Sequence, residues 1–483
     1  MTKKAESKLP NRVIPYSEAF KQFIPQGWAD YPASYTEPVG AAAYTVHRQR
    51  SIQDLFPNDR LVIPAGGYKV RSNDCDFRYR PHSAFAYLTG LGEDLEPDAA
   101  LVIESGKATL YFHARVPRTD PEFYSSAEYG EMWVGPRPSL EEMARYTTLT
   151  VRDSSELKQA LAEDVPTGGK LRIVPGVDGR LEALVNALRG PDAAADKELE
   201  RALSEARLVK DEFEIAQMEQ ACAATLVGFE AVIADIPEAV RRGRGERWVE
   251  GIFGLHARHI GNAVGYDTIA AAGDHACTLH WVHNDGEVRE GDLLLLDAGV
   301  EVNTLYTADI TRTLPVSGRF SPAQRRVYEA VLAAQQAGID AARPGADFID
   351  VHNAAVRVVA EHLAEWGILP VSVEETLSEE GGEFRRWMVH GTSHHLGIDV
   401  HDCAQARRKM YRGGKLKPGM IITVEPGIYF KSTDLLVPEE FRGIGVRIED
   451  DILITEDGCQ VLSSAFPRDP DAVENWMAEV QAR

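Results

Sequence analysis

The chain has 483 residues, 44% hydrophobic and 26% charged, which exceeds what one hydrophobic core organises, so we expect two or three domains. Its formal net charge of −22 argues against nucleic acid or an anionic membrane surface as a partner. No stretch approaches the roughly 20 apolar residues of a membrane helix. The first residues lack the apolar region of a secretory signal. The five cysteines form neither a disulfide framework nor a CxxC metal motif. We therefore expect a cytoplasmic protein.

The N-terminal part is predicted to be an α/β domain over residues 1–200. Short strands are expected at 100–104 and 108–113, separated by a Ser-Gly turn, and helices at 155–162 and 179–188 flank a strand at 171–174. The stretch FRYRPHSAFAYLTG at 77–90 is rich in arginine and aromatic residues, which is typical of buried core or of a wall of a site. The charged, alanine-rich segment 192–205 is typical of a linker or linking helix and places the domain boundary near residue 200.

The C-terminal part, residues 201–483, is predicted to repeat one plan twice. Asp211 and Glu214 form a capping box that opens a helix, a second helix follows near 248–260, and strands are expected around 270, 293–300 and 309–313. Ser321, Pro322 and Gln324 then open another helix, and a further one is expected at 348–366. Strands are predicted to follow at 388–390, 421–425, 446–449 and 452–455. The order, a helix pair and then strands, therefore occurs twice.

A short repeat in the residues supports two related halves. GDLLLLDAG, from Gly291 to Gly299, aligns without gaps on GMIITVEPG, from Gly419 to Gly427. Each segment has a glycine, mostly apolar residues, an acid and a final glycine, and the two acids are 128 positions apart (425 − 297). An ionised carboxylate is costly to bury beside such strands unless it is paired or bound to a metal. Two halves that pack against each other would bring these acids together.

Four acids and a group of histidines are the candidate metal ligands. Asp297 and Glu425 end the two matched strands, and Asp309 lies in TADITRTLP. In GVRIEDD, strand alternation puts Glu449 on the face opposite Asp450 and selects it. The histidines of WMVHGTSHHLGIDVHD are His390, His394, His395 and His401. We expect them in a strand or loop, because the Gly-Thr-Ser between His390 and His394 is a poor helix former. The i, i+4 spacing of those two histidines therefore does not indicate a helical metal pair.

This set of acids predicts a centre with two metal ions. Each acid taken alone is more often a surface residue. Together, however, buried carboxylates repel one another, and divalent cations relieve that repulsion. Four acids and one histidine suit two hard or borderline ions better than a thiolate zinc site. Two ions about 3.5–4 Å apart can share a water, lower its pKa and supply hydroxide at neutral pH.

Six motifs in chain order resemble one known family. CTLHW, LLLLDAG, ADITRTLPV, HGTSHHLGIDVHD, TVEPGIYF and GVRIEDD together resemble the creatinase/aminopeptidase family of the pita-bread fold. The Xaa-Pro aminopeptidase (aminopeptidase P) branch is most similar and prolidase is next, since the serine of HGTSHH favours the former. The resemblance is strong over about 205–465 and weak before that. It implies an α+β pita-bread catalytic domain with two pseudo-symmetric halves behind an α/β N-terminal domain.

The resemblance also implies roles for individual residues. Two divalent ions, manganese in the first place, would bind Asp297, Asp309, His394, Glu425 and Glu449, with Asp309 and Glu449 bridging both. The catalytic set would be Glu425, His280, His390 and His401, and the residues that line or brace the site would be Arg447, Tyr266 and Tyr429. One departure concerns the two aspartates: the family pattern separates them by eleven positions and this chain by twelve (309 − 297), so we expect a bulge or a longer turn between them.

The implied activity is that of a metallo-aminopeptidase that hydrolyses the N-terminal Xaa-Pro bond of peptides with a bridging hydroxide. Glu425 would move the proton of the attacking water, and His280 or His401 would donate to the oxyanion. The partners would be peptides with proline at the second position, and the family implies a homodimer or homotetramer. Prolidase, which cleaves dipeptides only, is the alternative enzyme. A non-enzymatic binding protein of the same fold is disfavoured because all five ligands are present.

Overall fold

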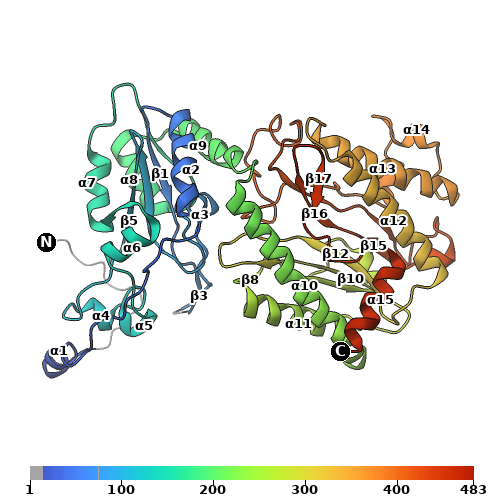
Figure 1. The fold of residues 1–483 in the computed structure, drawn as a ribbon, viewed down its shortest axis with the longest axis horizontal. Helices are drawn as coiled ribbons and strands as arrows, with labels where there is room; N and C mark the ends of the chain where they lie inside the picture. Colours follow the sequence, from blue (N-terminus) through green and yellow to red (C-terminus); the bar gives the residue numbers. More distant parts are fainter. Residues whose placement is uncertain (1–14, 74) are drawn as a thin grey trace.

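The computed structural model describes residues 15–73 and 75–483, which form an N-terminal part and a larger C-terminal part (Figure 1). The N-terminal part is built on a five-stranded sheet whose inner pairs are antiparallel and whose outer pairs are parallel. The strand order is β6 (Thr150–Asp153), β5 (Lys107–Phe112), β4 (Ala100–Glu104), β1 (Arg60–Pro64) and β7 (Leu171–Ile173). A small hairpin, β2 (Val70–Ser72) with β3 (Cys75–Asp76), lies outside it.

Helices cover both faces of this sheet because its strands alternate apolar side chains to either side. Leu61 and Ile63 of β1 belong to one buried cluster, and Val62 between them belongs to another. The first cluster includes residues of α2 (Ala42–Leu55), α3 (Ser83–Thr89), α6 (Leu140–Thr147) and α9 (Ala193–Ala206). The second includes residues of α7 (Leu157–Ala162) and α8 (Gly179–Arg189). The remaining helices here are α1 (Glu18–Phe23), α4 (Glu122–Ser125), α5 (Glu131–Val134) and the 3-10 turn η2 (Ser154–Glu156).

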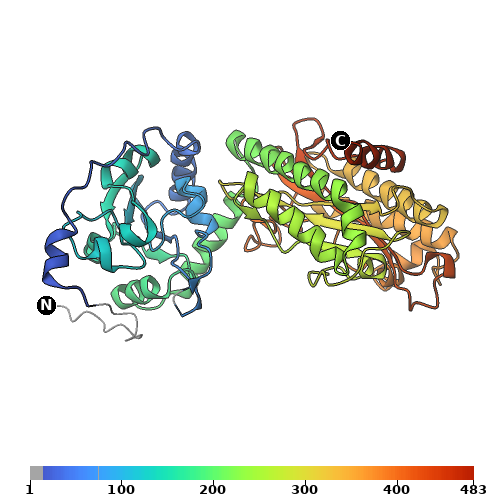
Figure 2. The ribbon, with the colours of Figure 1, turned by 90° about the horizontal axis from the view of Figure 1, so that it is seen from below.

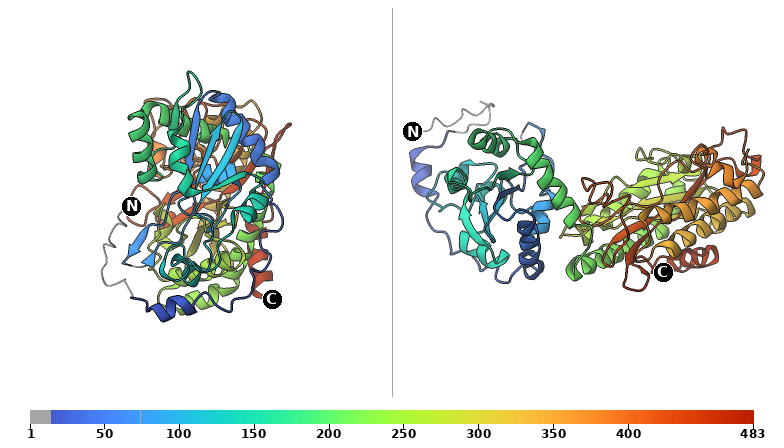
Figure 3. Two further views of the ribbon diagram at one scale, coloured as in Figure 1. Left: turned by 90° about the vertical axis from the view of Figure 1, so that its left-hand side faces the viewer. Right: turned by 90° about the horizontal axis from the view of Figure 1, so that it is seen from above.

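The predicted linker is a helix. Residues 193–206 form α9, whose N-cap Asp192 accepts a hydrogen bond from the backbone of Ala195. Leu199 and Leu203 of this helix belong to the buried cluster that includes strands of the N-terminal sheet. The helix leads from the N-terminal part to the C-terminal part (Figures 2 and 3). The two parts are therefore joined by regular structure with a buried apolar side.

The first half of the C-terminal part consists of two helices on a three-stranded antiparallel sheet. The predicted capping box of Asp211 and Glu214 is present at the start of α10. The helices are α10 (Glu212–Arg241) and α11 (Gly245–Ile260). The sheet has the order β12 (Ile310–Pro315), β10 (Leu293–Ala298) and β9 (Ile269–Ala272), beside which lie the pair β11 (Val300–Glu301) and β8 (Ala263–Val264) and the 3-10 turn η3 (Gly273–Cys277).

The second half has the same plan. The capping box of Ser321 and Gln324, with Pro322 in the first turn, opens its first helix as predicted. Its helices are α12 (Pro322–Ala341), α13 (Phe348–Glu365) and the short α14 (Val373–Thr376), η4 (Glu383–Arg386) and η5 (Glu439–Phe441). The sheet order is β13 (Ile421–Val424), β16 (Asp450–Ile454) and β17 (Cys459–Val461), with the pair β14 (Gly427–Phe430) and β15 (Ile444–Arg447). Helix α15 (Pro470–Gln481) packs on α10 and α12.

The repeated nine-residue segments fold alike, which explains the acids that end them. Gly291 and Gly419 both have a positive φ, of 93° and 85°, that favours glycine. In β10, Leu294 and Leu296 pack in the cluster that includes α10 and α11, so alternation turns Asp297 to the opposite face. In β13, Ile422 and Val424 likewise pack against α12 and α13. Each half therefore directs one acid away from its helices, toward the other half. This is the two-half architecture that the sequence predicts.

The extra residue between the two aspartates causes no break in register. Asp297 pairs with Thr311, and beyond Gly299 the bridge of Glu301 with Thr307 keeps the same register. The backbone N–H of Leu305, which has a φ of 74°, donates to the carbonyl of Val302 and closes a tight turn. Of the two possibilities expected from the sequence, the added length lies in the turn.

The predicted strand at 388–390 is wrong, and the N-terminal part contains elements that the prediction does not include. Trp387 and Met388 lie in an irregular segment, yet their side chains are buried. Their apolar character therefore reflects burial and not strand pairing. The Trp387 carbonyl accepts a backbone hydrogen bond from Tyr429. The unpredicted elements of the N-terminal part include β1, α2 and α6. None of the described helices is both long and apolar enough to cross a membrane.

Replacement of Gly299 by alanine is expected to open the hairpin that carries the two aspartates. A Cβ at this position would lie 1.6 Å from the carbonyl oxygen of Ala308, which is backbone and cannot move aside. We expect a loss of about 3 kcal/mol or more in the free energy of unfolding, together with loss of metal binding. Gly251→Ala is the matched control, because nothing lies within 4 Å of its Cβ position in α11, and it should be neutral or stabilising. Equal thermal unfolding of the two variants would contradict the expectation.

Candidate metal centre

Asp297 enters the site from β10 with both carboxylate oxygens engaged. Its Oδ1 lies 2.7 Å from the hydroxyl of Tyr266, and its Oδ2 accepts a hydrogen bond of 2.7 Å from Nη2 of Arg447. Burial raises the pKa of Asp297, and the charge of Arg447 opposes that shift. The arginine on β15, in the second half, thus fixes the orientation of the aspartate from the first half.

Asp309 and Glu449 come together where the two halves meet. The backbone N–H of Glu449 donates to the carbonyl of Thr311 at 3.1 Å, and the Thr311 hydroxyl donates to Glu449 Oε2 at 2.7 Å. Asp309, two residues before Thr311, places its Oδ1 2.6 Å from the hydroxyl of Tyr266. The strand alternation that selects Asp309 and Glu449 from the sequence is consistent with this arrangement.

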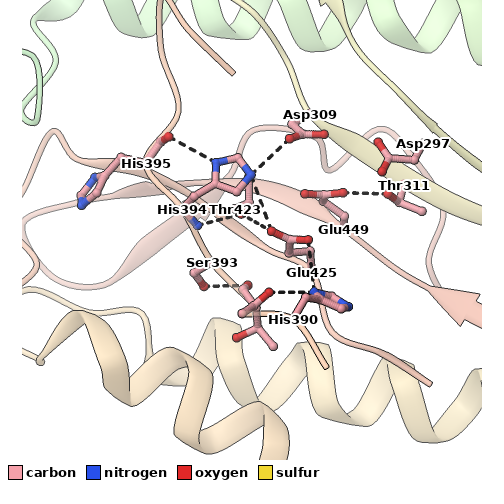
Figure 4. A network of polar contacts seen from close by, with 12 residues as sticks. Asp297, Asp309, Thr311, His390, Ser393, His394, His395, Thr423, Glu425 and Glu449 are labelled. Atoms are coloured by element: carbon pink, nitrogen blue, oxygen red, sulfur yellow. Dashed lines mark hydrogen bonds and ion pairs between the residues drawn. The ribbon is translucent and has the colours of Figure 1, made fainter. Parts of the chain in front are cut away.

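His394 and Glu425 complete the group from the second half (Figure 4). His394 directs Nδ1 to the carbonyl of His395, at 3.2 Å, which leaves Nε2 facing the acids. Nε2 lies 3.2 Å from Asp309 Oδ2 and 3.5 Å from Glu425 Oε1. Because a donor bond from Nδ1–H is how ligand histidines are commonly held, Nε2 is the atom available to a metal.

The charges in this group are unbalanced without a cation. Tyr266 has one hydroxyl proton, yet its oxygen lies within hydrogen-bond distance of two aspartates. Burial, followed by the charge of Asp309, raises the pKa of Glu449 well above its usual range. Burial also raises the pKa of Glu425 to about 7. Within residues 15–73 and 75–483, the four carboxylates share Arg447 and His394 as their cationic partners, so added positive charge would stabilise them.

The donor set fits a divalent cation. One ligand atom each of Asp309, His394 and Glu449 lies within 4.8 Å of the others, a span that one ion can fill. Carboxylate oxygens with a single imidazole suit hard or borderline ions such as Mn²⁺. Asp297 and Glu425 flank these three, so the full set of predicted ligands surrounds one space (Figure 4).

A cavity of about 620 Å³ opens onto these side chains. Ten of the eleven site residues predicted from the sequence line it: Tyr266, His280, Asp297, Asp309, His390, His394, His401, Glu425, Arg447 and Glu449. Tyr429 lies behind them, where its hydroxyl contacts His390 Nε2 at 2.8 Å and accepts a hydrogen bond of 3.0 Å from Arg447 Nη1. The cavity is thus large enough for several residues of an extended ligand beside the acids.

Two histidines that line the cavity, His390 and His401, have lowered pKa values, which favours their neutral form. Burial lowers the pKa of His390 to about 4, and the nearby Arg447 adds to the effect. Its Nδ1 contacts the carbonyl of Gly391 at 2.8 Å, so Nδ1 carries the proton and Nε2 accepts from the hydroxyl of Tyr429. Burial, with the charge of His394, also lowers the pKa of His401, whose ring meets that of His394 edge-on at 4.5 Å.

Thr423 is a further residue of the site that the sequence prediction does not include. Its hydroxyl accepts a hydrogen bond from the backbone N–H of His394 at 3.1 Å and donates to Glu425 Oε1 at 3.3 Å. It therefore connects two of the predicted ligands. Its position two residues before Glu425 in a strand is the signal that would identify it. Ser393, Tyr411 and Arg412 also line the cavity, from loops without periodicity to reveal them.

Metal uptake is expected to release protons between about pH 6 and 9. In the metal-free protein burial lowers the pKa of His394, but its hydrogen bond to Asp309 and the charge of Glu425 outweigh burial and raise it to about 9. A raised pKa stabilises the metal-free fold below the unfolded pKa of about 6.5, and this contribution is lost as the pH rises through 9. A metal requires the neutral imidazole, so affinity should increase with pH up to about 9. Calorimetry in buffers of different ionisation enthalpy measures the number of protons released when the metal binds. A metal affinity that does not change with pH would contradict the prediction.

Comparisons with known proteins identify the family. Residues 216–456 match the model of metallopeptidase family M24, and residues 44–172 match that of the aminopeptidase P N-terminal domain. The chain is 50% identical over 469 residues to Xaa-Pro aminopeptidase 1 of Streptomyces coelicolor, which covers 96% of this chain and 93% of that protein. It is 33% identical over 447 residues to Xaa-Pro aminopeptidase of Escherichia coli, covering 89% and 96%.

Solved structures agree with this assignment. Aminopeptidase PepP of Pseudomonas aeruginosa superposes with a TM-score of 0.79 at 29% identity, covering 92% of this chain and 99% of that one. Aminopeptidase P of Escherichia coli, with the inhibitor Pro-Leu, superposes with a TM-score of 0.78 at 29% identity and the same coverage. The boundary near residue 200 falls between the two matched ranges and stays a prediction. The chain belongs to metallopeptidase family M24, with an aminopeptidase P N-terminal domain in front of the catalytic domain.

Proposed function

We propose that the chain is an Xaa-Pro aminopeptidase that releases the first residue of peptides whose second residue is proline. The observation that carries the proposal is the 50% identity to an Xaa-Pro aminopeptidase over nearly the whole of both chains. The cavity agrees with it, because acids suited to a metal line the same space as His280, His390 and His401. Peptides are thus the proposed partners.

We propose two divalent ions, Mn²⁺ in the first place, as the cofactor. Asp297 would hold one ion, His394 and Glu425 the other, and Asp309 and Glu449 would contact both. The clustered ligand atoms and the excess of buried carboxylates support this assignment. When bound, such ions polarise a carbonyl group and lower the pKa of a coordinated water.

The residues of the chain would supply the proton transfers and the orientation. The bond before proline is a tertiary amide without N–H, so recognition depends on the carbonyl and on the free α-amine. Glu425 would take the proton of the attacking water on Oε and pass it to the proline nitrogen as that bond breaks. His280 and His401 would donate to the oxyanion. His390, held by Tyr429, would fix the place of Glu425, whose Oε2 lies 3.7 Å from His390 Nδ1.

A three-peptide comparison tests this proposal against prolidase, the second candidate. The metal is stripped, restored with Mn²⁺, and turnover is measured on an Xaa-Pro dipeptide, on Xaa-Pro-Yaa and on Xaa-Ala-Yaa. We expect rapid cleavage of Xaa-Pro-Yaa and little cleavage of the alanine peptide. Cleavage of the dipeptide alone would indicate prolidase. Equal cleavage of the alanine peptide would remove the proline specificity.

We also propose a cytoplasmic location and a homodimer or homotetramer. All five cysteines are free, which is typical of a reducing compartment. On α5, Met132, Trp133 and Val134 are about half exposed in a row, and such apolar surface is frequent at subunit interfaces. Sedimentation of the purified protein would decide the oligomeric state, and a monomer at micromolar concentration would contradict it.

A further inference from the structure

A fully buried carboxylate, Glu246, lies in the first turn of α11 and does not line the cavity. Four nitrogen atoms surround its two oxygens. Oε1 accepts from the backbone N–H of Ala272 at 2.8 Å and contacts His275 Nδ1 at 2.8 Å. Oε2 accepts from Trp281 Nε1 at 2.8 Å and from the backbone N–H of Gly286 at 2.7 Å. An ionised carboxylate has acceptor sites for all four contacts.

These contacts all come from one segment of the chain, residues 272–286. The same segment carries Leu279, His280 and Val282, which line the cavity beside the metal ligands. It has little regular structure of its own: β9 ends at its start, η3 is five residues long, and the rest is irregular. The backbone N–H of Glu246 in turn donates to the carbonyl of Gly286 at 3.2 Å, so the helix end and the segment hold each other.

Two further features show that the segment is shaped around this carboxylate. A Cβ on Gly286 would lie 2.7 Å from Glu246 Oε2, so only glycine brings its N–H this close. The rings of His275 and Trp281, which both contact Glu246, stack on each other with centroids 3.8 Å apart. His280 directly precedes Trp281, and its place in the cavity therefore depends on where the indole is anchored.

We propose that Glu246 is a positioning residue for the reaction: it fixes the segment 272–286 and thereby the place of His280 in the cavity. This inference rests on the proposed function, in which His280 donates to the oxyanion. Glu246→Gln keeps the shape but turns an NH₂ group toward two of the donors, so the segment would shift. A shift of about 1 Å at a reacting group can reduce turnover by about 10²-fold.

The test is a double-mutant cycle with His280. We expect Glu246→Gln to lower kcat by about 10–10²-fold with a smaller change in KM. In a His280→Ala background the same substitution should change kcat by less than about 3-fold, because the imidazole that Glu246 positions is then absent. Equal losses in both backgrounds would overturn the proposal, since a general loss of stability acts equally on both. Glu287→Gln, which changes an exposed carboxylate directly after Gly286 in the chain, is the matched control and should leave kcat unchanged.

A second measurement does not depend on activity. Hydrogen exchange of the amides in residues 273–286 should be faster in Glu246→Gln than in Glu287→Gln, with the exchange of β10 and β13 unchanged. Unchanged exchange in the segment would overturn the positioning role even if the protein cleaves Xaa-Pro bonds. Faster exchange in a protein that does not cleave them would support it while the proposed function fails. Should Glu246→Gln not fold, Trp281→Phe removes one donor and should show the same changes at smaller size.

Discussion

Replacement of Glu425 by glutamine is expected to lower kcat on Xaa-Pro-Yaa by about 10²–10⁴-fold, the range for loss of a general acid–base. Glutamine keeps an oxygen for the hydroxyl of Thr423 and the same volume, but it cannot accept and return the water proton. The fold should persist, because the backbone N–H of Glu425 still donates to the carbonyl of Thr392. The measurement is kcat with metal content determined on the same sample.

The metal content separates two explanations of a loss at Glu425. A variant that binds the full complement of metal and is slow supports the proton-transfer role, and a variant that recovers with added Mn²⁺ shows a ligand role. Near-normal turnover with full metal content would contradict the assignment. Glu440→Gln, which changes an exposed carboxylate paired with Arg326, is the control and should behave as the unmodified protein.

Replacement of Arg312 by methionine is expected to lower the free energy of unfolding by about 3–5 kcal/mol. Arg312 is fully buried, and its Nη2 donates to Asp450 Oδ1 at 2.8 Å. Its Nη1 donates to the carbonyls of Thr311 and Glu449, the two residues whose backbones bridge the halves. The substitution removes the nearer cation from buried Asp450, which keeps as a cationic partner only Arg468 Nε at 3.7 Å among the described residues, and it removes one donor from each of the two carbonyls.

A surface pair provides the comparison for Arg312. Arg289 and Glu287 are both more than half exposed, so Arg289→Met should cost about 1 kcal/mol or less. Denaturant unfolding of both variants with and without metal is the measurement. If Arg312→Met costs no more than Arg289→Met, the buried network does not join the halves as described.

The sequence predicts the two-half architecture and selects acids that the fold brings to one cavity, because both inferences depend on local pattern. Asp297 and Glu425 follow apolar runs between glycines, and Glu449 is separated from Asp450 by strand alternation alone. In the structure Asp450 pairs with Arg312 and does not line the cavity. Capping residues such as Ser321 similarly mark helix starts without any tertiary information.

What the sequence does not predict depends on contacts between distant residues. Trp387 and Met388 are buried by other segments without belonging to a strand. Their apolar pattern therefore predicts a strand that does not form. Glu246 precedes its donors His275 and Trp281 by 29 and 35 positions, and its surroundings in the sequence, RGRGERWVEG, indicate only a charged helix start. Strand β1 ends in proline and begins with a buried arginine, which weakens its apolar pattern.

Anomalous diffraction from crystals grown with Mn²⁺ tests most directly the claim that this cavity is a metal centre with two ions. We predict two peaks per chain about 3.5–4 Å apart. Asp309 and Glu449 should contact both ions, Asp297 one, and His394 and Glu425 the other. A single peak would contradict the dinuclear centre, and ions bound only by residues outside this set would contradict the site itself.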